Sequence, residues 1–340
     1  MQYLENIPLS TLTTMRLGGL ARYVVKITAT EDLKQAIQFA EERGLPWFVL
    51  GGGSNVVALG DYRGLIILNR ITAFKKLRED SDTATYQIGA GEVWDSVVER
   101  LVQAGLSGVE AMSGIPGFAG STPIQNVGAY GQEIADTLVE LSAFDSSSQR
   151  LVTLSPDDCA FTYRNSIFKN PETRHHVIVS ITLRLSKIPM QPPFYPSLQQ
   201  YLTDHQLTDY SPAQIRAAVP AIRAERLPDL NYLASAGSFF KNPIVQASVA
   251  YELLRRFPDM PHWEAPGQQF KLAAGWLIDQ AGLRSYSAHG LQIYPHNALV
   301  VTNISAQSGE DLLLFKSEVV AVVREMFGIT LEQEPETLPS

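Results

Sequence analysis

The sequence of 340 residues contains a single cysteine, Cys159. One thiol cannot form an internal disulfide, which is typical of proteins that work in a reducing compartment. Purely aliphatic runs are short, as at Leu65–Leu68, whereas a membrane-spanning helix needs about 18 apolar residues. The N-terminus starts at Met1 without a charged and then apolar export pattern. We therefore expect a cytoplasmic protein without membrane insertion.

Positive charge is also scarce. Charged residues make up 18% of the chain, and the formal net charge is −8. An acidic surface gives little attraction to nucleic acid, so no nucleic-acid partner is expected, and any anionic ligand needs a local cationic pocket. Hydrophobic residues make up 45%, an ordinary globular share. Because single domains rarely exceed about 250–300 residues, two domains are expected.

Prolines crowd the middle of the chain at Pro189, Pro192, Pro193 and Pro196. Proline removes a backbone donor and blocks helix interiors, so this stretch predicts a linker or an extended loop. We place the domain boundary here, with a first region over residues 1–188 in two lobes (about 1–70 and 71–188), a linker over 189–210 and a C-terminal domain over 211–340.

Hydrophobic periodicity predicts mixed α and β structure in both regions. Residues 33, 36, 37 and 40 fall on one helical face, and apolar residues alternate from 177 to 185 as in a half-buried strand. Beyond the boundary, the pattern predicts a helix over 271–281 and a strand over 329–334.

The first chemical candidate is a glycine bend at residues 51–55, Gly-Gly-Gly-Ser-Asn, which follows a buried strand. Glycines allow successive backbone N–H groups to converge on an anion. The pattern matches neither a P-loop nor the dinucleotide fingerprint of Rossmann folds. A plain turn is the structural alternative.

The second candidate is the segment 111–131, which contains five glycines and no charged residue. A long uncharged loop suits a flat, hydrogen-bonding ligand that needs close backbone approach. The alternative is an irregular core segment, which would have to pair all its backbone polar groups. Two such segments together favour a large cofactor with a pyrophosphate and a ring system.

Five motifs in order carry a resemblance to a known family. They are GGGSNVV (51–57), GIPGFAGSTPIQNVGAYGQEI (114–134), YRNSIFK (163–169), AGSFFKNP (236–243) and KLAAGWLIDQAGL (271–283). Together they resemble UDP-N-acetylenolpyruvoylglucosamine reductase, the flavoprotein of peptidoglycan precursor synthesis, and the likeness runs over nearly the whole chain. It implies an α+β fold, with an FAD-binding region of the vanillyl-alcohol-oxidase type followed by a smaller α+β substrate domain.

The resemblance implies non-covalent FAD. Its pyrophosphate would lie on the bend at 51–55 and the rest of the cofactor in the loop at 114–131. The implied cofactor residues are Gly51, Gly52, Gly53, Ser54, Asn55, Pro116, Gly117, Gly120, Ser121, Thr122, Ile124, Asn126, Gly128 and Tyr130.

The implied substrates are NADPH and UDP-N-acetylglucosamine enolpyruvate, which would use the same cleft in turn. The proline-flanked Tyr195 is similar to a tyrosine that closes over the substrate diphosphate in one subtype of the family. The implied substrate residues are Tyr163, Tyr195, Arg223, Arg226, Lys241 and Asn242, and an isolated arginine on a solvated helix face is the structural alternative. No metal and a monomeric state are expected.

The implied reaction moves a hydride from NADPH to N5 of FAD and then to the terminal enolpyruvyl carbon. Arg164 would stabilise the enolate-like charge, Ser238 would protonate the adjacent carbon, and Glu334 would polarise the carboxylate. Glu332 and Glu336 are nearby rivals of Glu334, whose place in a terminal strand is also that of an ordinary solvated glutamate.

Other functions remain as alternatives. Ser238 and Lys241, like Ser166 and Lys169, fit the S-x-x-K pattern of serine acyltransferases, but the accompanying triplets are absent. A catalytically inactive FAD or nucleotide-sugar binder would be expected to lack Arg164, Ser238 or the C-terminal glutamate. Another flavin oxidase of the same fold would not need the segment 236–243.

Overall fold

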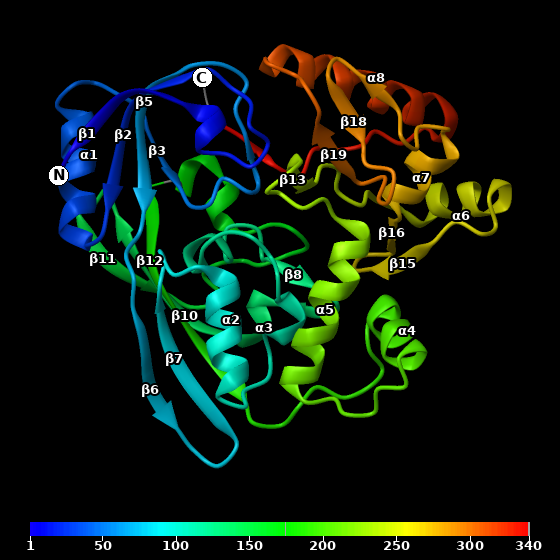
Figure 1. The fold of residues 1–340 in the computed structure, drawn as a ribbon, viewed down its shortest axis with the longest axis horizontal. Helices are drawn as coiled ribbons and strands as arrows, with labels where there is room; N and C mark the ends of the chain where they lie inside the picture. Colours follow the sequence, from blue (N-terminus) through cyan, green and yellow to red (C-terminus); the bar gives the residue numbers. More distant parts are fainter. Residues whose placement is uncertain (174, 339–340) are drawn as a thin grey trace. The chain divides into compact units, whose positions relative to one another are not determined.

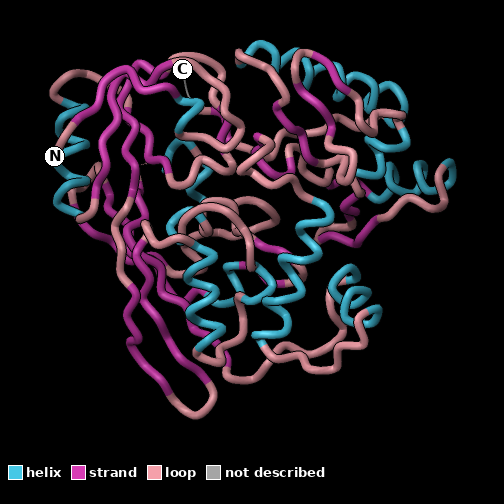
Figure 2. The backbone as a smooth tube through the Cα atoms, in the orientation of Figure 1, coloured by secondary structure: helices cyan, strands magenta, loops and turns pink. Residues whose placement is uncertain are grey.

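The structure, a computed structural model, describes residues 1–173 and 175–338. The chain divides into two compact units, each built from several stretches of sequence (Figure 1). The first unit comprises Met1–Asn6, Ala21–Gly52 and Arg63–Glu225. The second comprises Ile7–Leu20, Gly53–Tyr62 and the chain from Arg226 onward. Both contain helices and strands, which are coloured cyan and magenta in Figure 2.

The first lobe of the first unit is a four-stranded sheet in the order β1-β2-β5-β3. Its elements are β1 (Tyr3–Pro8), β2 (Leu20–Ile27), α1 (Thr30–Glu41), β3 (Trp47–Leu50) and β5 (Tyr62–Asn69). Strands β3 and β5 are parallel. The four apolar residues of α1 at 33, 36, 37 and 40 are fully buried against this sheet's core, which confirms the helical periodicity.

The second lobe is a five-stranded antiparallel sheet in the order β11-β10-β12-β7-β6. Its elements are β6 (Phe74–Glu79), β7 (Thr83–Gly89), α2 (Trp94–Gln103), β10 (Leu138–Asp145), β11 (Arg150–Leu154) and β12 (His176–Ser186). The short elements that carry the glycine loop are η2 (Glu110–Met112), η3 (Ala119–Ser121), β8 (Gly128–Ala129), β9 (Gln132–Glu133) and α3 (Ile134–Thr137).

Strand β12 is buried on both faces from Val177 to Val179, so the prediction of a half-buried strand is wrong there, whereas Arg184 near the end of the strand is exposed. A register shift against β10 lies between the pairs Ser142↔Ser180 and Ala143↔Ile178. Such a bulge changes which residues face each side. Val177 and Val179 therefore join the core of the first lobe, whereas Ile178 and the residues after the shift join the core around α2.

The proline-rich stretch contains a helix, α4 (Pro196–Asp204), where the sequence predicted a linker. Pro196 lies at the first helical turn, where proline needs no donor. Leu198 and Leu202 pack with Ile215 and Val219 of α5 (Pro212–Arg226), and both helices belong to the first unit. The units consequently divide between residues 225 and 226, rather than within 189–210, because apolar packing on α5 keeps this stretch with the first unit.

The second unit contains sheets in the orders β13-β19-β18-β17 and β14-β16-β15, and a parallel pair of β4 with β20. Its strands are β4 (Val56–Val57), β13 (Ala234–Ser238), β14 (Ile244–Gln246), β15 (His262–Ala265), β16 (Gln269–Leu272), β17 (Ser287–Ala288), β18 (Leu291–Ile293), β19 (Val300–Asn303) and β20 (Glu336–Thr337). Its helices are α6 (Ala247–Arg256), α7 (Ala274–Gln280) and α8 (Gly309–Phe327).

Two predicted elements of this unit differ from the structure. The expected helix at 271–281 begins only at Ala274, because the preceding residues pair in β16 between β14 and β15. The expected strand at 329–334 is reduced to one bridge, Phe240↔Gln333, and strand pairing resumes at β20. None of the described helices combines the length and apolar character that crossing a membrane requires.

Candidate flavin and substrate site

The two glycine-rich segments meet in the first unit. A methyl group on Gly51 would overlap the Ser121 hydroxyl, and one on Gly52 would lie 2.9 Å from the Gly117 Cα atom. A side chain at either position would therefore push the segments apart. Gly120 has the same constraint, because an added methyl group would overlap Ala90. The absence of side chains at these positions is thus a packing requirement of the site.

Two backbone N–H groups of the bend are available to bind a ligand. Within residues 1–173 and 175–338, the N–H groups of Gly51 and Gly52 donate no hydrogen bond to the chain. Both glycines are partly exposed. N–H groups left unpaired in a bend are suited to bind an anion. The rest of the predicted bend, Gly53 to Asn55, belongs to the second unit, where Gly53 has φ +62° and lies directly against the Leu12 carbonyl.

Arg70 is a candidate residue that the sequence did not reveal. Its Nη2 donates to the Gly51 carbonyl oxygen at 3.3 Å, and its guanidinium carbon lies 4.1 Å from the centre of the Phe118 ring. Burial lowers the pKa of Arg70. The residue follows the apolar strand β5, and the only sequence signal is a cation at the end of that strand, which is common at surfaces.

The loop after Met112 contains several backbone conformations that favour glycine. Gly114, Gly117 and Gly131 have positive φ values, as do Asn126 and Tyr130. A non-glycine residue in this region costs about 1 kcal/mol or more, so it persists only where the surroundings hold it. Such outliers concentrate at binding sites.

Two predicted cofactor side chains are instead used to hold the loop itself. Asn126 is buried, donates to Glu133 Oε2 and accepts from the Ala135 N–H at 3.2 Å. The Thr122 hydroxyl, also buried, donates to the Ala119 carbonyl at 2.7 Å. These side chains are thus already engaged in holding the loop, and only their remaining hydrogen-bonding capacity is available to a cofactor.

An ion pair fixes the start of the loop. Arg216 of α5 donates two hydrogen bonds to the carboxylate of Asp95, at 2.8 and 3.0 Å, and a third to the Ser113 hydroxyl at 3.0 Å. Asp95 also accepts from the Gly114 N–H at 2.6 Å. These bonds, with that from Arg216 the largest cause, lower the pKa of Asp95. Two-pronged arginine–carboxylate pairs hold geometry well.

Arg223 lies about two helical turns beyond Arg216 on α5, near Gly114. Burial lowers the pKa of this guanidinium, and the charges of Tyr130 and Asp95 oppose that shift. Among the described residues, the Arg223 side chain has neither an ion-pair partner nor a hydrogen-bond partner. A cation desolvated without a partner is costly, which is typical of a site that receives an anion.

Tyr195 also reaches the glycine loop. It lies just before α4, its side chain is 46% exposed, and its ring meets Tyr130 edge-on with centroids 5.9 Å apart. The sequence predicted Tyr130 and Tyr195 for different ligands. Their contact joins the predicted cofactor loop to the predicted substrate tyrosine within one unit.

Arg164 occupies a tight turn. Thr162 and Asn165 exchange backbone hydrogen bonds of 3.1 Å, and Tyr163 and Arg164 lie between them. Arg164 has φ +51°, an uncommon conformation for this residue type. Its Nη2 donates to the Gly128 carbonyl at 2.9 Å. The turn thus fixes the guanidinium at the end of the glycine loop.

Ser238 and Glu334 come close together in the second unit. The Glu334 N–H donates to the Phe239 carbonyl at 2.8 Å, next to Ser238 at the end of β13. Glu334 is buried, with 9% exposure. Glu332 instead has a side chain 75% exposed and pairs with Lys241 Nζ at 3.5 Å. Glu334 is therefore buried and Glu332 exposed, although a solvated glutamate was the ordinary expectation at both positions.

The remaining predicted substrate residues of the second unit have defined positions. Asn242 accepts a hydrogen bond of 2.9 Å from the N–H of Ala274 at the start of α7. Arg226, the last residue of α5, is exposed. Arg226 and Asn242, with Ser238, Lys241 and Glu334, belong to the second unit, while Tyr163, Arg164, Tyr195 and Arg223 belong to the first.

One alternative from the sequence loses support, and the single cysteine is buried. The Ser166 hydroxyl caps the turn at 167–169 and donates to the Ile124 carbonyl at 2.7 Å, so this S-x-x-K serine is structural. Cys159 is fully buried, and burial raises its pKa to about 12, which keeps the thiol protonated and unreactive.

Comparisons with known proteins agree with this arrangement. Residues 21–155 match the model of the FAD binding domain family. Residues 228–338 match the C-terminal domain of UDP-N-acetylenolpyruvoylglucosamine reductase. The enzyme of that name from Ralstonia nicotianae is 39% identical, over 96% of this chain and 97% of its own length. The chain belongs to the UDP-N-acetylenolpyruvoylglucosamine reductase family.

Other relatives extend this finding. The reductase of Dechloromonas aromatica is 37% identical over 97% of this chain and 98% of its own. The crystal structure of the Thermus caldophilus reductase covers 99% of this chain and 98% of its own, with a TM-score of 0.68 and 24% identity, which shows the shared fold. The chain is thus an FAD-dependent oxidoreductase of peptidoglycan precursor synthesis, and the predicted FAD-binding region with a C-terminal α+β domain is confirmed.

The residues present fit FAD. The first unit supplies uncommitted N–H groups at Gly51 and Gly52, a cation at Arg70 and an uncharged loop with strained backbone. The N–H groups and the guanidinium match a pyrophosphate, and the uncharged loop matches a flat ring system.

We predict that Gly51→Ala weakens FAD binding by about tenfold or more, since overpacking typically costs 1–3 kcal/mol and 1.4 kcal/mol is tenfold. Removing the Ser121 oxygen would leave the added methyl 3.6 Å from the Ser121 Cβ atom, an ordinary contact. The double variant Gly51→Ala/Ser121→Ala should therefore bind FAD more tightly than Gly51→Ala. Fluorescence titration of the deflavinated protein measures each affinity.

Gly60→Ala is the matched control, because a methyl group there meets nothing within 4 Å. Its FAD affinity should equal that of the original chain. Unchanged affinity in Gly51→Ala, or no recovery in the double variant, would show that the contact between the two segments does not shape the site.

Proposed function

We propose that this chain reduces UDP-N-acetylglucosamine enolpyruvate to UDP-N-acetylmuramate with NADPH as the reductant. The observation that carries the proposal is the hydrogen bond between Glu334 N–H and the Phe239 carbonyl. It brings the backbone of the buried residue Glu334 next to Phe239, the neighbour of Ser238, to which we assign the proton donor. The relatives' shared name supports the substrate, and a cytoplasmic, monomeric enzyme stays a prediction.

The first unit holds the cofactor in this proposal, and the second contributes groups for the substrate. When bound, FAD supplies a hydride acceptor for NADPH and a hydride donor for the terminal enolpyruvyl carbon. Gly51 and Gly52 would hold its pyrophosphate with backbone N–H groups, assisted by Arg70. The loop from Pro116 to Tyr130 would enclose its ring system without placing a charged side chain against it.

The nucleotide sugar is an anion, so its binding needs fixed cations in an acidic protein. Arg223 provides a guanidinium that is already desolvated and lacks a partner among the described residues. A diphosphate would supply the charge-assisted hydrogen bonds that it lacks. Tyr163, Tyr195, Arg226, Lys241 and Asn242 are the further proposed contacts. Asn242 would also fix the start of α7 through its existing bond to Ala274.

Addition of hydride to the terminal carbon leaves negative charge on the neighbouring carbon and its carboxylate. Arg164 would stabilise this charge with its fixed guanidinium, since preorganised donors act most strongly where charge develops. Ser238 would then donate its hydroxyl proton to the carbon. A hydroxyl is a weak acid, so the buried Glu334 would serve to polarise the substrate carboxylate and to orient this donor.

We predict that Ser238→Ala leaves flavin reduction by NADPH unchanged and slows reduction of the enolpyruvyl sugar by about 10²–10⁴-fold, the usual range for a lost proton donor. Stopped-flow absorbance of the flavin separates the two half-reactions. In the same strand, the buried Ser235 hydroxyl bonds to the Val301 carbonyl at 3.0 Å. Ser235→Ala is the matched control and should lower stability without separating the half-reactions. Equal slowing of both half-reactions in Ser238→Ala would make Ser238 structural.

The three C-terminal glutamates can be distinguished by substitution. We predict that Glu334→Gln lowers kcat by about 10²–10³-fold, as expected for loss of a group that acts on the developing charge. Glu332→Gln removes only an exposed ion pair with Lys241 and should leave kcat unchanged. Steady-state assays with the nucleotide sugar measure both. A larger loss in Glu332→Gln than in Glu334→Gln would contradict the assignment.

A further inference from the structure

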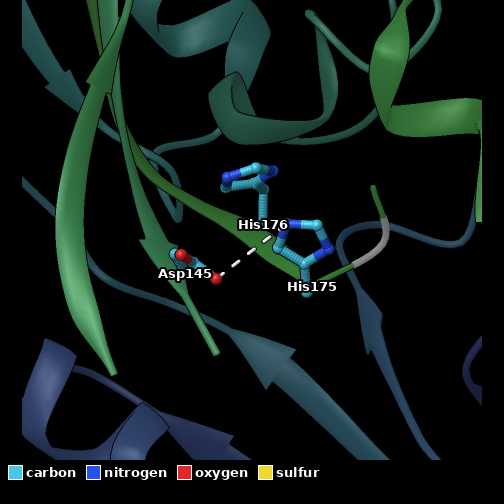
Figure 3. A group of neighbouring side chains, drawn as sticks. All are labelled: Asp145, His175 and His176. Carbon is cyan, nitrogen blue, oxygen red and sulfur yellow. Dashed lines mark ion pairs between the residues drawn. The ribbon is translucent and has the colours of Figure 1, made fainter. Parts of the chain in front are cut away.

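A cluster of potential metal ligands lies in the first unit, among residues that are not proposed for FAD. Asp145, His175 and His176 each offer one ligand atom, and these atoms all lie within 4.8 Å of one another. Figure 3 shows both imidazole rings beside the carboxylate at the end of β10. Within the part of the chain that the structure describes, this is the only such group of three. Sequence spacing did not indicate it, because Asp145 is distant in sequence from the two adjacent histidines.

The backbone fixes the three residues relative to one another. Asp145 is the last residue of β10 and lies directly opposite His176, the first residue of β12. The Ser146 N–H then donates to the His175 carbonyl at 2.9 Å, which extends the pairing by one step. Because the backbone of these residues is already fixed by strand pairing, little conformational freedom is lost when a ligand binds.

His176 has the hydrogen bonding expected of a metal ligand. Its Nδ1 atom is buried and has no hydrogen-bond partner among the described residues. A buried imidazole nitrogen without a hydrogen-bond partner can offer its lone pair to a metal ion, as the ring nitrogens of metal-bound histidines do.

The other two ligands are accessible and suitably charged. Asp145 Oδ1 accepts from the Ser147 N–H at 2.9 Å, and Oδ2 accepts from the Ser148 hydroxyl at 2.6 Å. The His175 side chain is 34% exposed, and its Nε2 lies 3.9 Å from Asp145 Oδ1. The charged residue opposite Asp145 on β11 is Arg150, which is exposed and forms no ion pair with it among the described contacts.

We propose that Asp145, His175 and His176 form a binding site for a divalent transition metal of the zinc class. Two imidazoles and one carboxylate are borderline ligands that suit Zn²⁺ better than Mg²⁺ or Ca²⁺. Bonds of about 2.1 Å in a tetrahedral site place ligand atoms about 3.4 Å apart, so small side-chain rotations suffice. A fourth position stays open to water. The site goes beyond the reductase activity and does not depend on it.

The test uses the flavin-loaded protein without a histidine tag, with Zn²⁺ added as its chloride and binding followed by isothermal titration calorimetry. We expect one bound Zn²⁺ per chain, and an affinity at least about tenfold weaker in both His176→Gln and Asp145→Asn. Co²⁺ in place of Zn²⁺ should give the visible absorption of a low-coordinate nitrogen and oxygen site. The same spectrum should be absent in His176→Gln.

His205→Gln is the control, because His205 is exposed and stacks on Tyr201 at the end of α4. It should bind Zn²⁺ as the original chain does. Melting temperatures measured without metal show whether each variant folds. The Co²⁺ spectrum of the unsubstituted protein tests the site even if a variant does not fold. Absence of stoichiometric binding to the original chain, or equal binding in His176→Gln, would overturn the proposal.

Discussion

The close approach of two backbone segments is the constraint on which the flavin site depends. Gly51 and Gly52 lie so near Gly117 and Ser121 that no side chain fits between them. The N–H groups of Gly51 and Gly52 donate no hydrogen bond within the described residues. The close contact also fits a loop that carries so little charge. Ion pairs across so short a gap would force the segments apart, whereas backbone groups can pair at this distance.

Side chains outside the two segments hold them in place. The Asp95–Arg216 pair fixes the loop at Ser113 and Gly114, and Arg164 bonds to its far end at Gly128. Tyr195 packs on Tyr130. Strained residues such as Asn126 and Tyr130 keep positive φ values because these contacts restrain them. These contacts restrain the loop in the conformation that the site requires, and they need not involve the ligand.

The sequence predicted the fold class, the family and the two glycine segments, because each is a local pattern. Apolar spacing in α1 and the order of motifs are readable along the chain. Contacts between residues distant in sequence could not be predicted in this way. The Asp95–Arg216 pair and the place of Arg70 over Phe118 join residues distant in sequence, and no local pattern marks them.

The errors have the same origin. The proline-rich stretch indicated a linker, but Leu198 and Leu202 find apolar partners on α5, so a helix forms. Alternation in β12 indicated a half-buried strand, but a bulge against β10 lets it serve two cores. Residues 269–272 became a strand because β14 and β15 flank them. The resemblance selected Glu334, but no local pattern predicted that Glu334 is buried and Glu332 exposed, since burial depends on what the rest of the chain covers.

The most direct test of the central claim is an anaerobic stopped-flow measurement of flavin absorbance on the protein loaded with FAD. The account predicts that NADPH removes the absorbance of the oxidised flavin and that UDP-N-acetylglucosamine enolpyruvate then restores it. Restoration should be stoichiometric with the sugar added. Loss of absorbance that the sugar does not reverse, or a flavin that NADPH does not reduce, would contradict it.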